Sequence, residues 1–299
     1  MTKGAPPMPL SSSDASELFR QPPDSFIDVG HGGVAYRKVG TGPDVVFSHG
    51  WPVSGATFRC LLPHLVDHVT CHLVDYVSTG SSRFTQDAEV SIQGHIDALR
   101  TTVDHIGVDS VALVGHDSGG LIARHAMAGD DRLRSLGLIN TEPAVGVSWR
   151  FKMFLSNRHV PGFGRALGWL AGKPGIRRNK FVLGDAFTDR SLLDGEFDEF
   201  FLAPLNEDRA RQVTAVRLLK SFDYRFIDEL PDVHRRISAP VRLVWGVDDP
   251  FFPIEAARKD VATFAQASLV EIEAAGLFSH EEKPAEVAEA LLPALVGDA

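Results

Sequence analysis

An apolar run that ends in a glycine-rich turn carries the clearest chemical signal in this chain. Asp117 lies at the tip of the turn, and Gly115 and Gly119 are the small residues that a sharp reversal needs two positions before and after the tip. A frame centred on Ser118 would put His116 at the first small position, where it fits poorly. The pattern therefore predicts a strand–turn–helix elbow that presents Asp117 as a nucleophile.

A carboxylate nucleophile selects a particular reaction. It attacks saturated carbon and forms an alkyl ester, which water must then hydrolyse. Epoxides and carbon–halogen bonds suit this chemistry better than esters or amides do. We therefore expect an enzyme, a hydrolase that works through a covalent alkyl ester on Asp117.

Three more segments place polar residues directly after predicted strands. They are His49-Gly50-Trp51-Pro52 after 45–47, Gly246 to Pro250 after 241–245, and the segment around His280 after 268–273. Ligands bind at the carboxyl edge of the strands in an open α/β sheet. The order of nucleophile, acid and histidine along the chain also matches this elbow class. The segments are therefore expected to meet in one catalytic site.

Together these motifs resemble the α/β-hydrolase superfamily, and within it the branch of epoxide hydrolases and haloalkane or haloacetate dehalogenases. The resemblance covers about residues 25–145 and 226–299. Its marks are His49-Gly50-Trp51-Pro52, Gly115 to Gly120, Gly246 to Pro253, and Ser279-His280-Glu281. It implies an α/β-hydrolase fold, in which a mostly parallel eight-stranded sheet is flanked by helices and carries an inserted helical cap.

The chain is expected to divide into three parts. They are a flexible N-terminal arm at 1–25, the hydrolase core at 26–145 and 226–299, and the helical cap, or lid, at 146–225. Strands that alternate with helices predict a parallel sheet that is covered on both faces. A hairpin is expected over about 26–47, with its turn at Gly40-Thr41-Gly42.

The resemblance also implies roles for individual residues. His280 would be the base that activates water, and general-base help of this kind contributes about 10²–10⁴ in rate. Either Asp249 or Glu142 would orient this histidine, because relatives place the acid at one position or the other, and the Pro-Phe that follows favours Asp249. The backbone N–H groups of Trp51 and Ser118 would form the oxyanion hole.

The leaving group separates epoxide from halide chemistry. An opening epoxide needs an acidic donor, whereas a departing halide needs weak N–H donors. Haloalkane dehalogenases carry tryptophan directly after the nucleophile, where this chain has Ser118, and Trp51 looks more like the epoxide hydrolase version. Tyr224 and His159 in the cap are the expected leaving-group donors, and Trp51 and His49 complete the predicted substrate-binding group.

These observations favour a hydrolase that opens epoxides to diols. Three alternatives stand beside it. One is a dehalogenase of small haloalkanes or haloacids, another is a serine-type esterase that uses Ser118, and the third is a non-catalytic receptor that binds a small ligand on the same fold. Halide release, a Ser118 substitution and tight binding without turnover would distinguish them.

Composition limits the partners and the location. The 299 residues carry a formal net charge of −9, which argues against nucleic acid as a partner. No apolar run reaches the roughly 18 residues of a membrane span. Since Cys60 and Cys71 are the only cysteines, a disulfide framework is not expected, and the reducing cytoplasm is the predicted location.

No metal and no cofactor are expected. His64 and His68 are four residues apart on a predicted helix, but no further ligand cluster accompanies them. Aromatic residues of the predicted cap indicate a cavity that favours an apolar ligand. The predicted partner is therefore a small apolar organic substrate, and the sequence makes no prediction of the oligomeric state.

Overall fold

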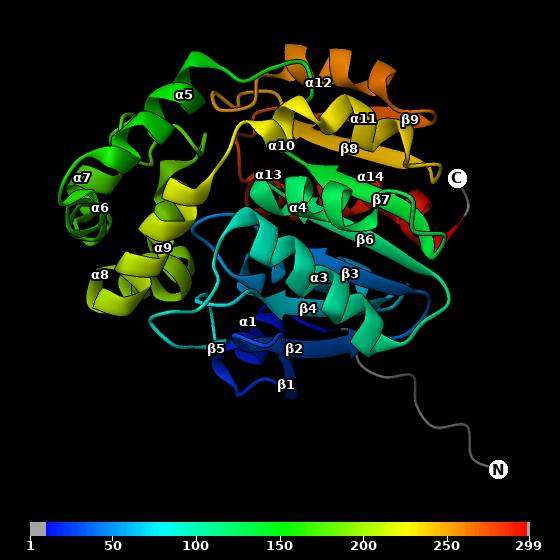
Figure 1. The fold of residues 1–299 in the computed structure, drawn as a ribbon, viewed down its shortest axis with the longest axis horizontal. Helices are drawn as coiled ribbons and strands as arrows, with labels where there is room; N and C mark the ends of the chain where they lie inside the picture. Colours follow the sequence, from blue (N-terminus) through cyan, green and yellow to red (C-terminus); the bar gives the residue numbers. More distant parts are fainter. Residues whose placement is uncertain (1–9, 298–299) are drawn as a thin grey trace.

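The computed structural model describes residues 10–297, and these fold around one mixed β-sheet (Figure 1). The strands are β1 (Ser25–Asp28), β2 (Gly32–Gly40), β3 (Asp44–Ser48), β4 (Thr70–Asp75), β5 (Arg83–Phe84), β6 (Val111–His116), β7 (Leu133–Ile139), β8 (Val241–Gly246) and β9 (Ala267–Ile272). Eight of them follow one another in the spatial order β1-β2-β4-β3-β6-β7-β8-β9, and β5 pairs with β2. All neighbours from β4 to β9 are parallel, whereas β2 pairs antiparallel with β1, β4 and β5. The mostly parallel sheet that the sequence predicts is confirmed.

Helices cover both faces of this sheet. Those of the core are α1 (Ser12–Arg20), α2 (Leu62–Leu65), α3 (Ile92–Ile106), α4 (Ser118–Met127), α10 (Arg225–Asp228), α11 (Leu230–Arg235), α12 (Ile254–Asp260), α13 (Ser279–Glu282) and α14 (Pro284–Val296), with short turns η1 (Gly55–Phe58) and η5 (Val261–Thr263). α4 packs on β3, β6 and β7 with α3 and α11 beside it, and α14 packs on β7, β8 and β9 with α2 beside it (Figure 1). Within residues 10–297, no helix has the length and apolar character to cross a membrane.

The stretch predicted as the cap is helical and lies beyond one end of the sheet, at the left in Figure 1. It contains α5 (Trp149–Ser156), α6 (Phe163–Ala171), α7 (Pro174–Arg177), α8 (Ala203–Glu207) and α9 (Arg209–Ser221), with the turns η2 (Asn157–His159) and η3 (Arg190–Leu193) and the π-helical turn η4 (Asp198–Leu202). These elements leave the core after β7, and the chain returns to it through α10 and α11 before β8.

Residues 10–25 do not form the flexible arm that the sequence predicts. They contain α1, whose first turn is closed by a capping box between Ser11 and Asp14. The helix buries Ala15 and Phe19 against the core, and Arg20 pairs with Glu199 at 2.7 Å. This apolar face and the ion pair to the cap segment hold the helix in place. Residues 1–9 of the predicted arm lie outside the described residues.

Strand pairing at the start of the sheet also differs from the predicted hairpin. β1 and β2 form the hairpin, and β2 then pairs with β4 instead of β3. The chain crosses β4 after Gly40-Thr41-Gly42, so that β3 lies parallel between β4 and β6. This crossing brings the carboxyl end of β3 level with that of β6, with Ser48 opposite Gly115.

The ends of β3 and β6 are in backbone contact at the elbow. A Cβ atom on Gly119 would lie 2.1 Å from the carbonyl oxygen of Ser48, a distance that no side chain can adopt. Asp117, two residues before Gly119, has φ 51° and ψ −136°, in a region that is costly for residues other than glycine. The predicted elbow is therefore present, and close backbone packing holds its strained tip.

We expect Gly119→Ala to lower the free energy of unfolding by about 1–3 kcal/mol, because the added methyl group must displace the backbone of Ser48. Gly175→Ala is the matched control, since a Cβ at Gly175 meets no atom within 4 Å. Urea unfolding of the two variants and the wild type measures the difference. Equal stability of the two variants would contradict the packing described for the elbow.

Candidate active site

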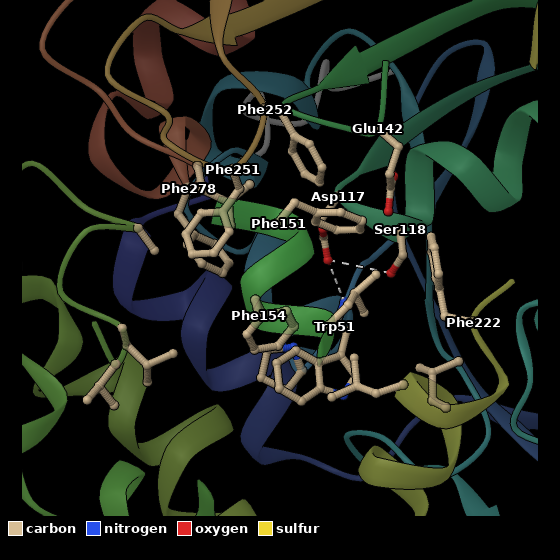
Figure 2. A pocket seen from close by; sticks show the side chains of 18 of the residues that line it. Trp51, Asp117, Ser118, Glu142, Phe151, Phe154, Phe222, Phe251, Phe252 and Phe278 are labelled. Carbon is tan, nitrogen blue, oxygen red and sulfur yellow. Dashed lines mark hydrogen bonds between the residues drawn. The ribbon is translucent and has the colours of Figure 1, made fainter. Parts of the chain in front are cut away.

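A cavity lies between the core and the cap, at the carboxyl ends of the central strands (Figure 2). It holds about 860 Å³ of empty space, its open mouth included. Only three of its lining side chains, Asp117, Ser118 and Glu142, carry oxygen atoms. Most of the wall is hydrocarbon, and phenylalanines from cap and core are prominent in it: Phe151, Phe154, Phe222, Phe251, Phe252 and Phe278.

Asp117 lines this cavity with one carboxylate oxygen fixed. The backbone N–H of Trp51 donates to its Oδ2 over 2.8 Å, and the backbone N–H of Ser118 donates to the same carboxylate. Its Oδ1 makes no hydrogen bond within residues 10–297. The structure thus brings Asp117, Trp51 and Ser118 together as the sequence predicts. A carboxylate held in this way can attack with its other oxygen, while the two N–H groups stabilise an oxyanion.

Glu142 is the second acidic group of the cavity. It is buried directly after β7, and the hydroxyl of Thr141 contacts its Oε2 at 3.0 Å and the carbonyl oxygen of Asp117 at 2.7 Å. Arg124 donates to Thr141 Oγ1 and to the carbonyl oxygen of Glu142, at 3.0 and 2.7 Å. These contacts fix the two acidic residues relative to each other.

Burial raises the pKa values of both acids. For Asp117 the nearby charge of Glu142 raises the pKa further, and the N–H donors of Ser118 and Trp51 oppose the increase. The pKa of Glu142 is raised by burial, against the effects of its own backbone N–H and of Arg124. Two carboxyls that share a dry cavity disfavour a second negative charge, so the pair holds a proton to higher pH than isolated carboxyls do.

Asp249 is buried beside these groups with neutral partners. Its Oδ2 accepts from Asn140 Nδ2 at 2.9 Å, and its Oδ1 accepts from the backbone N–H groups of Phe251 and Phe252 at 2.8 and 3.1 Å. Burial raises the pKa of Asp249 to about 7. Within residues 10–297, no histidine hydrogen-bonds to either Asp249 or Glu142. Neither predicted acid therefore orients a catalytic histidine in this structure.

His280 does not reach Asp117, contrary to the prediction. It lies in α13, whose first turn directs it into the core, where its Nε2 contacts Thr57 Oγ1 at 2.8 Å. Its ring packs at 4.3 Å from that of His116. Burial lowers the pKa of His280 well below its usual value, and the neighbouring His116 ring and Arg59 guanidinium lower it further. It is therefore a neutral core residue.

Leu277 and Phe278 are the residues that the loop after β9 presents to the cavity. The backbone of this loop packs closely against that of Ala186, since a Cβ on Gly276 would lie 2.6 Å from the carbonyl oxygen of Ala186. The side chain that follows Gly276 enters the cavity, and the histidine comes three residues later. Within residues 10–297, no histidine lines the cavity. In the sequence, the glycine at position 276 after the last predicted strand is the signal that could have drawn attention to Leu277.

Two of the predicted substrate-binding groups are already engaged by the protein. The indole Nε1–H of Trp51 donates to the carbonyl oxygen of Ala215 on α9 at 3.1 Å, although its ring lines the cavity. His49 accepts the backbone N–H of Tyr76 at Nε2, so its Nδ1–H donates to the carbonyl oxygen of Gly50 at 2.9 Å. His49 therefore shapes the loop after β3 and has no free N–H for a substrate.

The two predicted leaving-group donors of the cap lie away from the cavity. Tyr224 stands at the start of α10, where its ring packs edge-on at 5.8 Å from Phe222. His159 is exposed in η2 and accepts from Nε of its neighbour Arg158 at 3.1 Å. Neither residue lines the cavity, and the cap residues that do line it are hydrocarbon side chains. Residues 10–297 also contain no cluster of three or more histidine, cysteine or acidic side chains that could hold a metal ion.

Comparison with known proteins identifies the family to which the chain belongs. Residues 43–284, which include all the site residues above, match the alpha/beta hydrolase fold family. The chain is 27% identical to haloalkane dehalogenase 2 of Mycobacterium tuberculosis, over 89% of this chain and 93% of that protein. It is 27% identical to a pimeloyl-(acyl-carrier protein) methyl ester esterase of Chromobacterium violaceum, over 82% and 92%. The structure of the epoxide hydrolase CorEH superposes with a TM-score of 0.72 at 19% identity, over 87% and 94%.

The raised pKa of Asp249 predicts how stability depends on pH. Its pKa is about 7 in the folded protein and about 4 in an unfolded chain. The folded state therefore binds the proton more tightly, and Asp249 stabilises the fold below about pH 4 and loses this contribution as the pH rises through 7. Asp249→Asn should remove this part of the pH dependence. Urea unfolding at pH 5 and pH 8 tests this, and an unchanged pH dependence in the variant would contradict it.

Proposed function

Since the chain belongs to the α/β-hydrolase fold family and is a hydrolase of that family, we propose that it acts on small apolar epoxides through Asp117. One observation carries the proposal. The carboxylate of Asp117 stands in an apolar cavity with Oδ2 held by the N–H of Trp51 and with Oδ1 unbonded within residues 10–297. Such a group is a positioned nucleophile for saturated carbon.

Ring opening needs a proton for the departing oxygen, and Glu142 is the group that can supply it. In the reactive form of the pair, Asp117 is ionised and Glu142 holds the proton. Asp117 Oδ1 attacks a ring carbon, the carbon–oxygen bond of the epoxide breaks, and the alkoxide takes the proton of Glu142. The products are a hydroxyalkyl ester on Asp117 and a carboxylate on Glu142, so that charge and protons balance.

The same cavity favours epoxides over halides. A departing halide needs N–H groups that face the cavity, but the indole N–H of Trp51 is bonded to the carbonyl oxygen of Ala215. Ser118 stands where haloalkane dehalogenases carry a tryptophan. The 27% identity to haloalkane dehalogenase 2 makes halides the second candidate class.

A serine esterase is less consistent with the site. Ser118 Oγ lies 3.5 Å from Asp117 Oδ2. Within residues 10–297, no histidine contacts this hydroxyl to remove its proton. Ser118 also follows the strained tip of the elbow, where Asp117 stands.

Covalent labelling tests the nucleophile. Incubation with styrene oxide should add the full mass of the epoxide to the peptide that contains Asp117, because ring opening loses no atom. Asp117→Asn should show no addition, and Ser118→Ala should retain it. Mass spectrometry of the digested protein, with the diol measured in parallel, reads the result. If no adduct forms with styrene oxide or 1-bromobutane, no diol forms from styrene oxide, and Ser118→Ala abolishes ester hydrolysis, the proposal is wrong.

Glu142→Gln tests the proton donor. The variant keeps the shape of the side chain but cannot transfer a proton, so the rate of adduct formation with styrene oxide should fall by about 10²–10⁴. The rate with 1-bromobutane is the internal control, because a halide leaves as an anion without a proton. Quenched-flow mass spectrometry measures both rates. Equal losses with the two electrophiles would show that Glu142 holds the site together and does not act as the acid.

A further inference from the structure

We infer that Leu277 stops the reaction at the ester, so that the protein captures one alkyl group per chain on Asp117. This inference rests on the proposed function, and it concerns the second half of the reaction. There, water must attack the ester carbonyl carbon and give up a proton to a base.

Within the described part of the chain, no histidine lines the cavity to supply an imidazole for this step. The loop after β9 presents Leu277 and Phe278 to the cavity, and its histidine, His280, contacts Thr57 in the core instead. The wall on the side of this loop is hydrocarbon. A water molecule in a protein interior needs two to four polar partners, and this side of the cavity supplies none. Without a held water and a base, ester hydrolysis loses the factor of about 10²–10⁴ that a general base contributes.

The neighbours of Leu277 would suit a catalytic base, although Leu277 itself is apolar. The loop that carries Leu277 is tied to the loop that carries Asp249, because the N–H of Asp248 donates to the carbonyl oxygen of Ala275 at 3.0 Å. Asp249 is buried with neutral donors alone, Asn140 Nδ2 and two backbone N–H groups. Buried carboxylates normally have a charged or strongly polar partner. Position 277 therefore lies on a loop that is bonded to the Asp249 loop, and its side chain lines the same cavity as Asp117.

The rest of the hydrolytic machinery is intact. The N–H of Trp51 already holds the carboxylate oxygen that becomes the ester carbonyl, and the N–H of Ser118 acts on the same carboxylate. They stabilise the tetrahedral oxyanion whichever group positions and deprotonates the attacking water. What the cavity lacks, among the described residues, is an imidazole on the side of the loop after β9 that could position and deprotonate that water, so a single substitution at Leu277 can restore turnover.

Time courses with styrene oxide test the inference. We expect the wild-type protein to gain one equivalent of adduct quickly and to release diol at least about 10² times more slowly than the adduct forms. Leu277→His should hydrolyse the ester about 10²–10⁴ times faster, and it should release diol continuously with no lasting adduct. Intact-mass spectrometry and diol quantification follow both steps.

Two control variants separate catalysis from packing. Leu277→Phe adds a ring without a base and should keep the stable adduct. His280→Gln should also keep it, because His280 does not line the cavity. Thermal unfolding confirms that each variant is folded. Should Leu277→His fail to fold, persistence of the ester in the wild type and in His280→Gln still decides the inference.

The outcomes distinguish this inference from the proposed function. If the wild type forms diol over many turnovers without accumulating adduct, the proposed function stands and the inference is overturned, with Glu142 as the remaining base at the cavity. If Leu277→His folds but hydrolyses the ester no faster than Leu277→Phe, the role of Leu277 is overturned. If neither adduct nor diol forms, the proposed function itself fails.

Discussion

The site depends on one hydrogen bond between the ends of two neighbouring strands. The N–H of Trp51, just after β3, donates to Oδ2 of Asp117, just after β6. The contact is possible because β3 and β6 are parallel neighbours with Ser48 opposite Gly115, and because Gly119 leaves room for the carbonyl group of Ser48. Such donors oppose the increase in pKa that burial and the nearby Glu142 cause at Asp117. The close backbone packing at the elbow is therefore what allows an anion to form there.

Charge balance around this carboxylate explains why protons stay in the cavity. Asp117, Glu142 and Asp249 are all buried near one another, and Arg124 is the cation that acts on Glu142. Arg124 is itself buried, which lowers its pKa, and Asp260 shares its charge. One guanidinium cannot neutralise three carboxylates in a low dielectric. The pKa values of these acids are therefore raised, and the cluster retains protons that it can donate to a substrate.

The sequence predicted the elements that local physics controls. The elbow around Asp117 followed from the spacing of Gly115 and Gly119, whereas the hole at Trp51 was implied by the resemblance to the hydrolase superfamily. Placement of the histidine failed because it depends on the path of a loop. The loop's path is set by backbone contacts of Gly276 with residues far away in the chain, such as Ala186. Tyr224 and His159 failed for a similar reason, because polar residues of a helical cap can face either the cavity or solvent.

The two halves of the proposed reaction depend on different parts of the fold. Ester formation needs the ends of β3 and β6, Glu142 after β7, and the hydrocarbon wall of the cap. Ester hydrolysis needs the loop after β9, whose backbone is held by Gly276 and by the bond from Asp248 to Ala275. Because backbone contacts fix this loop, its side chain at position 277 can change without a change of fold. Burial raises the pKa of Asp249 to about 7, and the apolar residue at position 277 supplies no cation that would oppose this increase.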